Sequence, residues 1–131
     1  MKVFRTLFLL VMLAGLGATS CRDTKTENEH MREAALSYYG HLIAGEYDQC
    51  VDAIVYKDSM TEEYRAQMID VMAQYAEREK QRTGGMVSVR VLADTLLEDV
   101  GHVFLEVVYA DSTSEEVSLP MVRSVEGWKI Q

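Results

Sequence analysis

Cysteine and proline are nearly absent from this sequence. Its 131 residues include two cysteines, Cys21 and Cys50, and one proline, Pro120. The sequence has no Cys/His cluster, His-x-x-x-His pair or calcium-binding loop, so it predicts no metal site and no cofactor. It also lacks a Gly-x-Ser-x-Gly turn and a phosphate-cradling glycine loop. With one proline and no low-complexity segment, the chain is expected to form a compact domain.

Positive charge is also scarce. The chain has 13 Lys and Arg residues against 21 Asp and Glu residues, a formal net charge of −8 at pH 7. Residues 1–21 hold Lys2 and Arg5 but no acid, so the rest of the chain has 11 basic and 21 acidic residues and a net charge of −10. A surface of this sign repels nucleic acid and anionic lipid head groups. We therefore predict that the protein binds no nucleic acid.

The longest apolar run lies near the N-terminus and is too short to span a membrane. It covers residues 7–16, about ten residues, whereas a spanning helix needs roughly twenty. Lys2 and Arg5 precede the run, and the small residues of 17–20 lead from it to Cys21. This order is typical of a bacterial lipoprotein signal, in which the cysteine is acylated and the chain is cut before it. We predict a signal peptide over residues 1–20 and a lipid on Cys21.

Lipidation of Cys21 has consequences for location and for Cys50. Two or three acyl chains give durable membrane attachment, so the predicted location is the bacterial cell envelope, with the outer membrane favoured. The polar segment 21–28 is interpreted as the lipidated cysteine and its tether. Cys50 then has no partner for an intramolecular disulfide, and its apolar neighbours at helical spacing predict a buried, unreactive thiol. Two alternatives stay open: an ordinary secretory signal, and an uncleaved membrane anchor.

The remaining residues, 29–131, are predicted to form one domain whose first half is helical. Thr26-x-x-Glu29 is a capping box for a helix that ends at Gly45. A shorter helix is expected up to about Tyr56, with Asp48 as its N-cap. Ser59-x-x-Glu62 would cap a third helix that ends at Gly84. The apolar stripes of the two long helices are Met31, Ala35, Tyr38, Tyr39, Leu42 and Ile43, and Tyr64, Met68, Val71, Met72 and Tyr75.

The second half alternates apolar and polar residues with the period of β-strands. The residues predicted to face the core are Val87, Val89 and Val91, then Val103, Leu105, Val107 and Tyr109, then Val117, Leu119 and Met121, and finally Trp128 and Ile130. Pro120 indicates an edge position or a bulge within the third strand. Helices followed by consecutive antiparallel strands predict an α+β fold, with three helices covering one face of a curved sheet of about four strands.

This order of elements resembles the nuclear transport factor two-like superfamily. The resemblance is carried by Tyr38-Tyr39 after Ala34, by Leu42-Ile-Ala-Gly-Glu-Tyr-Asp48, and by the closing Val122-x-x-x-Glu-Gly-Trp-Lys-Ile130. More narrowly, the chain is similar to small bacterial lipoproteins with that cone-shaped, cystatin-like fold. The resemblance covers roughly residues 27–131. It implies a cone whose mouth, in the enzymes of the superfamily, holds a carboxylate, a His or a Tyr.

Three residues of the catalytic type are candidates for such a mouth: Glu106, His41 and His102. A carboxylate in an apolar pocket has a raised pKa and can act as a general base. The alternative, which we favour, is that Glu106 lies on an exposed or dimer-facing surface of the sheet and is paired or solvated. Several aromatic residues could line a pocket, but their spacing favours the core: Tyr38, Tyr39, Tyr64, Tyr75, Tyr109 and Trp128. The methionines of the third helix are likewise expected in the core.

The strand 103–109 is apolar on both faces, because Phe104 and Val108 alternate with its core residues. Both sides of the sheet are therefore expected to be covered, one by helices and the other by a second copy of the chain. Sheet-to-sheet dimers are frequent in the superfamily that the chain resembles. The first functional hypothesis is a membrane-anchored module that binds a small ligand or an envelope protein without catalysis. The alternatives are an enzyme of the isomerase or dehydratase kind and a purely structural spacer.

Overall fold

The computed structural model describes residues 26–131. The predicted signal peptide, the predicted lipidation site Cys21 and the tether up to residue 25 lie outside the described residues. None of the described helices is both long and apolar enough to cross a membrane.

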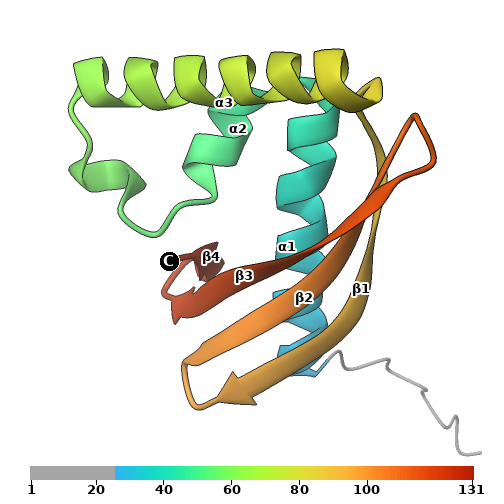
Figure 1. Cartoon of the computed structure of the whole chain (residues 1–131). Helices are drawn as coiled ribbons and strands as arrows, with labels where there is room; N and C mark the ends of the chain where they lie inside the picture. The colour runs from blue at the N-terminus through green and yellow to red at the C-terminus, as the bar shows by residue number, and fades with distance from the viewer. Residues whose placement is uncertain (1–25) are drawn as a thin grey trace, which may run out of the picture.

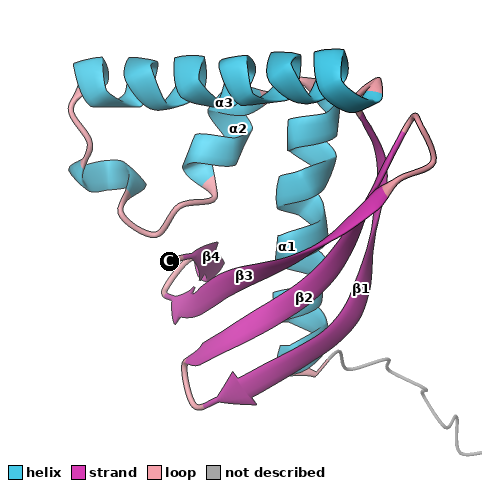
Figure 2. Cartoon of the chain, in the orientation of Figure 1, coloured by secondary structure: helices cyan, strands magenta, loops and turns pink. Residues whose placement is uncertain are grey.

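Four helical segments form the first half of the domain (Figures 1 and 2). They are α1 (Glu27–Ala44), α2 (Tyr47–Asp52), the short 3-10 helix η2 (Lys57–Ser59) and α3 (Glu62–Thr83). The Thr26 side chain caps α1 by accepting a hydrogen bond from the Glu29 backbone N–H, as the capping box predicts. Helix α1 begins at Glu27, so the last two residues of the segment 21–28, which the sequence assigned to the tether, are helical.

The helix ends are set by local chemistry that the sequence revealed only in part. Gly45 and Gly84 terminate α1 and α3 with positive φ angles of 79° and 85°, as expected for C-cap glycines. The predicted caps of α2 and α3 are wrong. Asp48 lies inside α2, and the cap of α3 is Thr61, whose side chain accepts from the Tyr64 N–H. The chain after α2 turns into η2 instead of continuing the helix.

The second half is a four-stranded antiparallel meander in the order β1-β2-β3-β4. Its strands are β1 (Met86–Leu97), β2 (Val100–Tyr109), β3 (Ser114–Ser124) and β4 (Gly127–Ile130). The sheet curves around α1, which lies along its inner face (Figure 1). This arrangement confirms the predicted α+β class and the predicted packing of helices on one face of a curved sheet.

The core forms two apolar clusters along α1. The cluster against the sheet consists of Met31, Ala35, Val103, Leu105, Leu119, Met121, Trp128 and Ile130. The cluster against the other helices consists of Leu42, Cys50, Val51, Ile54 and Met72. Cys50 is fully buried, as predicted, and burial raises the pKa of its thiol to about 11, with help from Asp48 and Glu46. A thiol with such a pKa stays protonated and unreactive at neutral pH.

The strand register explains two details of the sheet. Pro120 accepts a hydrogen bond from the Gln131 N–H, so its missing donor faces the side of β3 where β4 has already ended. This is the edge-like position that proline requires, and the pairing of β2 with β3 continues without a bulge. By contrast, the pairing of β1 with β2 shifts between Met86 and Ser88. The shift turns Val87 outward, to 54% exposure, although the simple alternation predicts it in the core.

A charged cluster joins the start of α1 to β1. Asp94 accepts hydrogen bonds of 2.7 Å from both Arg32 and Asn28. The Arg32 guanidinium, followed by the Asn28 amide, holds the pKa of the Asp94 carboxyl below its usual range. Asp94 points to the inner face in register with Val103, so these bonds hold α1 on the sheet at the edge of the core.

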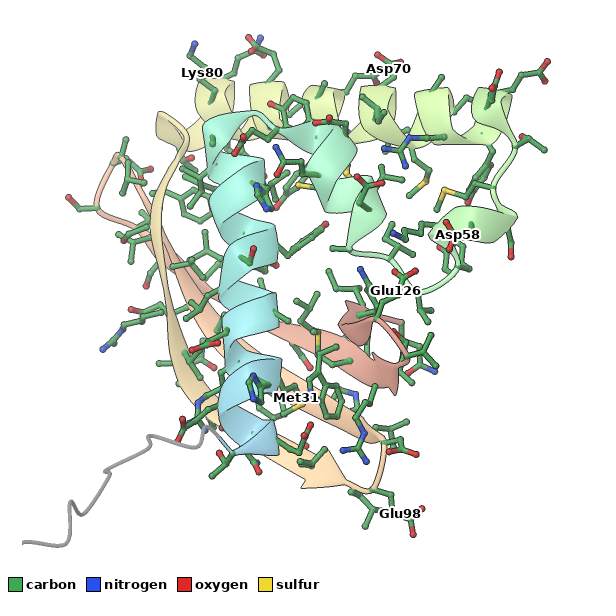
Figure 3. The ribbon with its side chains drawn as sticks, turned by 180° about the vertical axis from the view of Figure 1, so that it is seen from behind. Met31, Asp58, Asp70, Lys80, Glu98 and Glu126 are labelled. Carbon is green, nitrogen blue, oxygen red and sulfur yellow. The ribbon has the colours of Figure 1, made fainter. Side chains whose placement is uncertain are left out.

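The long helix α3 crosses the end of α1 and extends beyond it (Figure 1). Asp70 and Lys80 lie on its outer side (Figure 3). Only Met72 of the predicted apolar stripe of α3 is buried, while Tyr64, Val71 and Tyr75 are each more than one-third exposed. The expectation that the whole stripe belongs to the core is therefore wrong. The part of α3 that extends beyond α1 and α2 has no neighbouring element among the described residues to cover its apolar side chains.

Candidate functional site

Glu106 lies on the outer face of the sheet, not in the mouth of a cone. It is directly opposite Arg90 in the register of β1 and β2, and the Arg90 Nε donates to Glu106 Oε1 at 2.8 Å. The Arg90 side chain is 68% exposed. Glu106 therefore forms a cross-strand ion pair with Arg90 on the surface of the sheet, as we favoured from the sequence. Its side chain does not reach the inner face of the sheet.

The two histidine candidates lie apart from Glu106 and from each other. His41, near the end of α1, has its Nδ1 3.1 Å from Glu46 Oε1 and its Nε2 3.4 Å from the Ser37 hydroxyl. His102, on the outer face of β2, is exposed and stacks on Phe104 with ring centroids 6.3 Å apart. The structure therefore brings together none of the three residues. Within residues 26–131, no three His, Cys, Asp or Glu side chains converge as metal ligands.

A polar hollow of about 500 Å³ lies where the end of α3 meets the hairpin between β2 and β3. The backbone joins the two elements here, because the Asp111 N–H donates to the Thr83 carbonyl at 2.9 Å. We call this site the polar hollow. Its lining consists of Tyr75, Glu79, Arg82, Thr83, Tyr109, Asp111, Thr113, Ser114 and Glu115.

Two bonded pairs organise the polar hollow. Glu79, only 9% exposed, accepts a 2.6 Å hydrogen bond from Arg82, whose guanidinium also lies over the ring of Tyr109. The Tyr109 hydroxyl donates to Glu115 Oε2 at 2.8 Å. Burial and then this bond to Glu115 raise the pKa of Tyr109, so the phenol stays a neutral donor at physiological pH. The arrangement is a network of aromatic rings and carboxylates with one guanidinium.

An apolar hollow of about 390 Å³ lies between α1 and α3 and shares Tyr75 with the polar hollow. We call it the apolar hollow. Its lining consists of Tyr38, Tyr39, Leu42, Met68, Val71, Met72, Tyr75 and Arg78. The tyrosines of α1 pack edge to face with ring centroids 5.3 Å apart. Burial is the largest cause that raises their pKa values, that of Tyr38 to about 12. We refer to the two hollows together as the mouth.

Sequence reasoning missed the polar residues of the mouth, yet each continues a stripe that it had identified. Glu79 follows Tyr75 by four residues on α3, where the apolar pattern fades into charges. Glu115 pairs with Val107 and precedes Val117 on the inner face of β3. Extending each stripe by one step would have found both carboxylates. Of the aromatic residues considered for a pocket, the structure places Tyr38, Tyr39, Tyr75 and Tyr109 in the mouth.

Trp128 belongs to a different surface. It is 8% exposed, its Nε1 donates to Glu27 at 3.0 Å, and the Arg123 guanidinium lies 5.9 Å from its ring centroid. Together with His41 it lines another shallow hollow of about 260 Å³, which shares Tyr38 with the apolar hollow. His41 therefore faces the outside of α1 and does not reach the mouth.

Comparison with known proteins identifies the fold. No known family profile matches the sequence, and no curated protein matches it either. A solved structure from Campylobacter jejuni, provisionally named an NTF2-like transpeptidase, is similar with a TM-score of 0.62 at 15% identity and covers 75% of this chain and 94% of its own. A SEC-C motif containing protein from Rhodopseudomonas palustris gives a TM-score of 0.50 at 13% identity over 75% of this chain and 72% of its own.

A third structure, an NTF2-like protein with a cystatin-like fold from Novosphingobium aromaticivorans, gives a TM-score of 0.45 at 13% identity over 79% of this chain and 77% of its own. At such identities a likeness shows the fold alone. The chain has an NTF2-like α+β fold, as its element order predicted. This fold carries both binding modules and isomerase or dehydratase enzymes, so the function has to be argued from the mouth.

Proposed function

We propose that this protein is a lipid-anchored cell-envelope protein whose NTF2-like domain binds a small ligand in the mouth without catalysis. The observation that carries the proposal is the meeting of the two hollows at Tyr75. One hollow is lined mainly by apolar and aromatic side chains, and the other presents convergent polar groups. Small-molecule sites have this composition: an apolar body with a few polar groups that fix orientation.

The position of the mouth suits a protein anchored through Cys21. Helix α1 begins at the same end of the domain as the turn between β1 and β2 (Figure 1). The mouth is lined by residues of the later part of α1, of α3 and of the hairpin between β2 and β3. Eighteen residues of α-helix separate the two ends of α1, about 27 Å at 1.5 Å per residue. Five residues lead from Cys21 to Thr26, a reach of at most about 18 Å. An anchor at Cys21 would therefore hold the α1 start near the membrane and leave the mouth accessible from the aqueous side.

Catalysis is the second candidate, and the mouth would have to supply its residues. Glu79 is nearly buried beside Tyr75 and Tyr109, a setting that suits a general base. However, Glu79 is bonded to Arg82, and Glu115 to Tyr109, so each carboxylate already has a partner. Each carboxylate can still accept a hydrogen bond from a ligand with its remaining lone pairs. Ligand binding needs only such a bond, whereas catalysis would also need a base positioned against a reacting atom, and we therefore place binding first.

The outer face of the sheet is proposed as the surface for a second copy of the chain. Phe104 and Val100 are 37% and 47% exposed there, and Val108 is half-buried beside them. A dimer through this face would cover these side chains and leave the mouth free, because the mouth opens on the inner side. The mass measurement described next also reports this state: a monomeric mass would contradict the dimer.

Native mass spectrometry of the protein purified from its envelope tests the ligand-binding proposal. The wild-type protein is expected to carry a small-molecule adduct. The substitution Val71→Trp should remove the adduct, because Val71 lines the apolar hollow and an indole would occupy its space. Val71 is 55% exposed, so the larger side chain is tolerated by the fold.

Val87→Trp is the matched control. Val87 is 54% exposed but lies on β1, outside the residues that line the mouth. The adduct should persist in this variant. An adduct that survives Val71→Trp, or one that both substitutions remove equally, would contradict ligand binding in the apolar hollow.

A further inference from the structure

The polar hollow already holds a cation, supplied by the chain itself. The Arg82 guanidinium is 2.6 Å from Glu79 and 5.6 Å from the ring centroid of Tyr109. The burial of the two partners is unequal: the Glu79 side chain is 12% exposed and that of Arg82 is 60% exposed. The acceptor groups are therefore fixed in the wall of the hollow, whereas the cation that they hold reaches in from solvent. A carboxylate combined with an aromatic face is the pairing that recognises ammonium and guanidinium groups.

Negative charge exceeds positive charge in the polar hollow. Three carboxyl groups, those of Glu79, Asp111 and Glu115, line it against the single guanidinium of Arg82. Hydrogen bonds from the Thr113 side chain and backbone lower the pKa of Asp111, which keeps it ionised. Among these carboxylates Arg82 is hydrogen-bonded to Glu79 and interacts with Asp111 and Glu115 at longer range. Glu115 itself is held by a neutral phenol. The hollow can therefore accept a further positive charge close to Glu115.

The apolar hollow determines the chemistry of the part of the ligand that lies away from its charged group. It adjoins the polar hollow at Tyr75, so a molecule that places its charged group near Glu115 would extend its other end between α1 and α3. That end meets Leu42, Met68 and Met72, which favour an apolar body.

We propose that the mouth takes a small cationic amphiphile, with an ammonium or guanidinium group between Glu115, Glu79 and Tyr109 and an apolar body in the apolar hollow. The ligand's cation shares or replaces the position of Arg82. This inference rests on the proposed ligand-binding function and adds the chemical class of the ligand.

Calorimetric titration of the full-length protein in lipid nanodiscs tests the ligand class, with empty nanodiscs as the blank. Three probes share a phenyl body and differ in their polar group: phenethylammonium, phenethyl alcohol and phenylpropanoate. Phenethylammonium is expected to bind about tenfold more tightly than the alcohol, the size of one charge-assisted hydrogen bond after desolvation. Phenylpropanoate should bind more weakly than either.

The neighbouring residues Glu115 and Glu116 give a matched pair of variants, because they lie on opposite faces of β3. Glu115 opposes Val107 on the inner face, and Glu116 opposes Glu106 on the outer face. Glu115→Gln should remove most of the tenfold preference for the ammonium, while Glu116→Gln should keep it. Both positions are exposed, so neither change threatens the fold.

The possible results distinguish a failure of the cationic ligand class from a failure of the proposed ligand-binding function. Equal binding of the alcohol and the ammonium, tighter binding of the carboxylate, or equal effects of the two glutamine variants would each overturn the cationic class. None of these results affects the adduct test with Val71→Trp. If no probe binds, the ligand class is overturned, and the proposed function still stands or falls by the adduct.

Discussion

Replacing Cys21 with serine is expected to abolish the incorporation of labelled palmitate into the protein. A serine hydroxyl cannot form the thioether that links the lipid to the chain, so the chain would keep its leader over residues 1–20. The effect should be all or none, because Cys21 follows the leader and small residues directly precede it. The loss would also change membrane attachment, since each buried methylene contributes about 0.8 kcal/mol and two or three chains hold a protein durably.

Cys50→Ser is the control for this experiment. Cys50 is fully buried against α1, with its Sγ 3.7 Å from the Tyr38 carbonyl oxygen. The serine variant should incorporate palmitate like the wild type. Labelling that survives Cys21→Ser, or labelling that disappears with Cys50→Ser, would contradict a lipid anchor on Cys21.

Truncating Met31 to alanine is expected to lower the free energy of unfolding by about 3 kcal/mol. Met31 is fully buried in the cluster between α1 and the sheet, and Figure 3 shows it near the start of that helix. Gly101 on β2 leaves space for it: a Cβ built at Gly101 would lie 2.6 Å from the Met31 Sδ and 2.5 Å from the Thr95 carbonyl oxygen. The truncation is expected to leave a cavity, because the residues around a buried side chain relax only partly when it is shortened.

Thermal and urea unfolding measure this loss. For a domain of this size, about 3 kcal/mol corresponds to a decrease in Tm on the order of 15 °C. Leu97→Ala is the control, since Leu97 is 74% exposed near the turn between β1 and β2 and its truncation should cost less than about 0.5 kcal/mol. If Met31→Ala is no more destabilising than Leu97→Ala, the packing of α1 on the sheet described here is wrong.

Hydrophobic periodicity correctly predicted the elements in which a single apolar face packs against a single neighbouring layer. The alternation in β2 places Val103, Leu105 and Val107 in the core, and all three are at most 1% exposed. The capping glycines were equally clear, because the positive φ of Gly45 and Gly84 suits glycine and few other residues. In these places local pattern and tertiary packing agree.

The predictions failed where tertiary packing decided the outcome. The stripe of α3 has a helical period, but nothing in its sequence says that the helix extends past its neighbours, so Tyr64 and Val71 were assigned to the core. The bulge at Val87 depends on the register with β2, which no local pattern contains. The choice of Thr61 over Ser59 as a cap is a competition between two hydroxyl residues two positions apart.

The candidate site shows the same limit. The sequence supplied residue types, and Glu106 attracted attention because it stands among apolar neighbours on β2. Its face of the sheet decides its role, and there Arg90 opposes it. Glu79 and Glu115 belong to two elements whose ends meet only in the folded domain. Because the two residues are far apart in the chain, no sequence pattern shows that they share a site, although each continues an apolar stripe.

A crystal structure of the protein extracted from its envelope, with its native ligand retained, would show directly whether the mouth binds a ligand. We predict ligand density in the apolar hollow between Met72 and Tyr75, with a polar group within hydrogen-bonding distance of Glu115 or Glu79. Density for a ligand on the outer face of the sheet, or a mouth closed by the packing of Tyr39 against Tyr75, would contradict it.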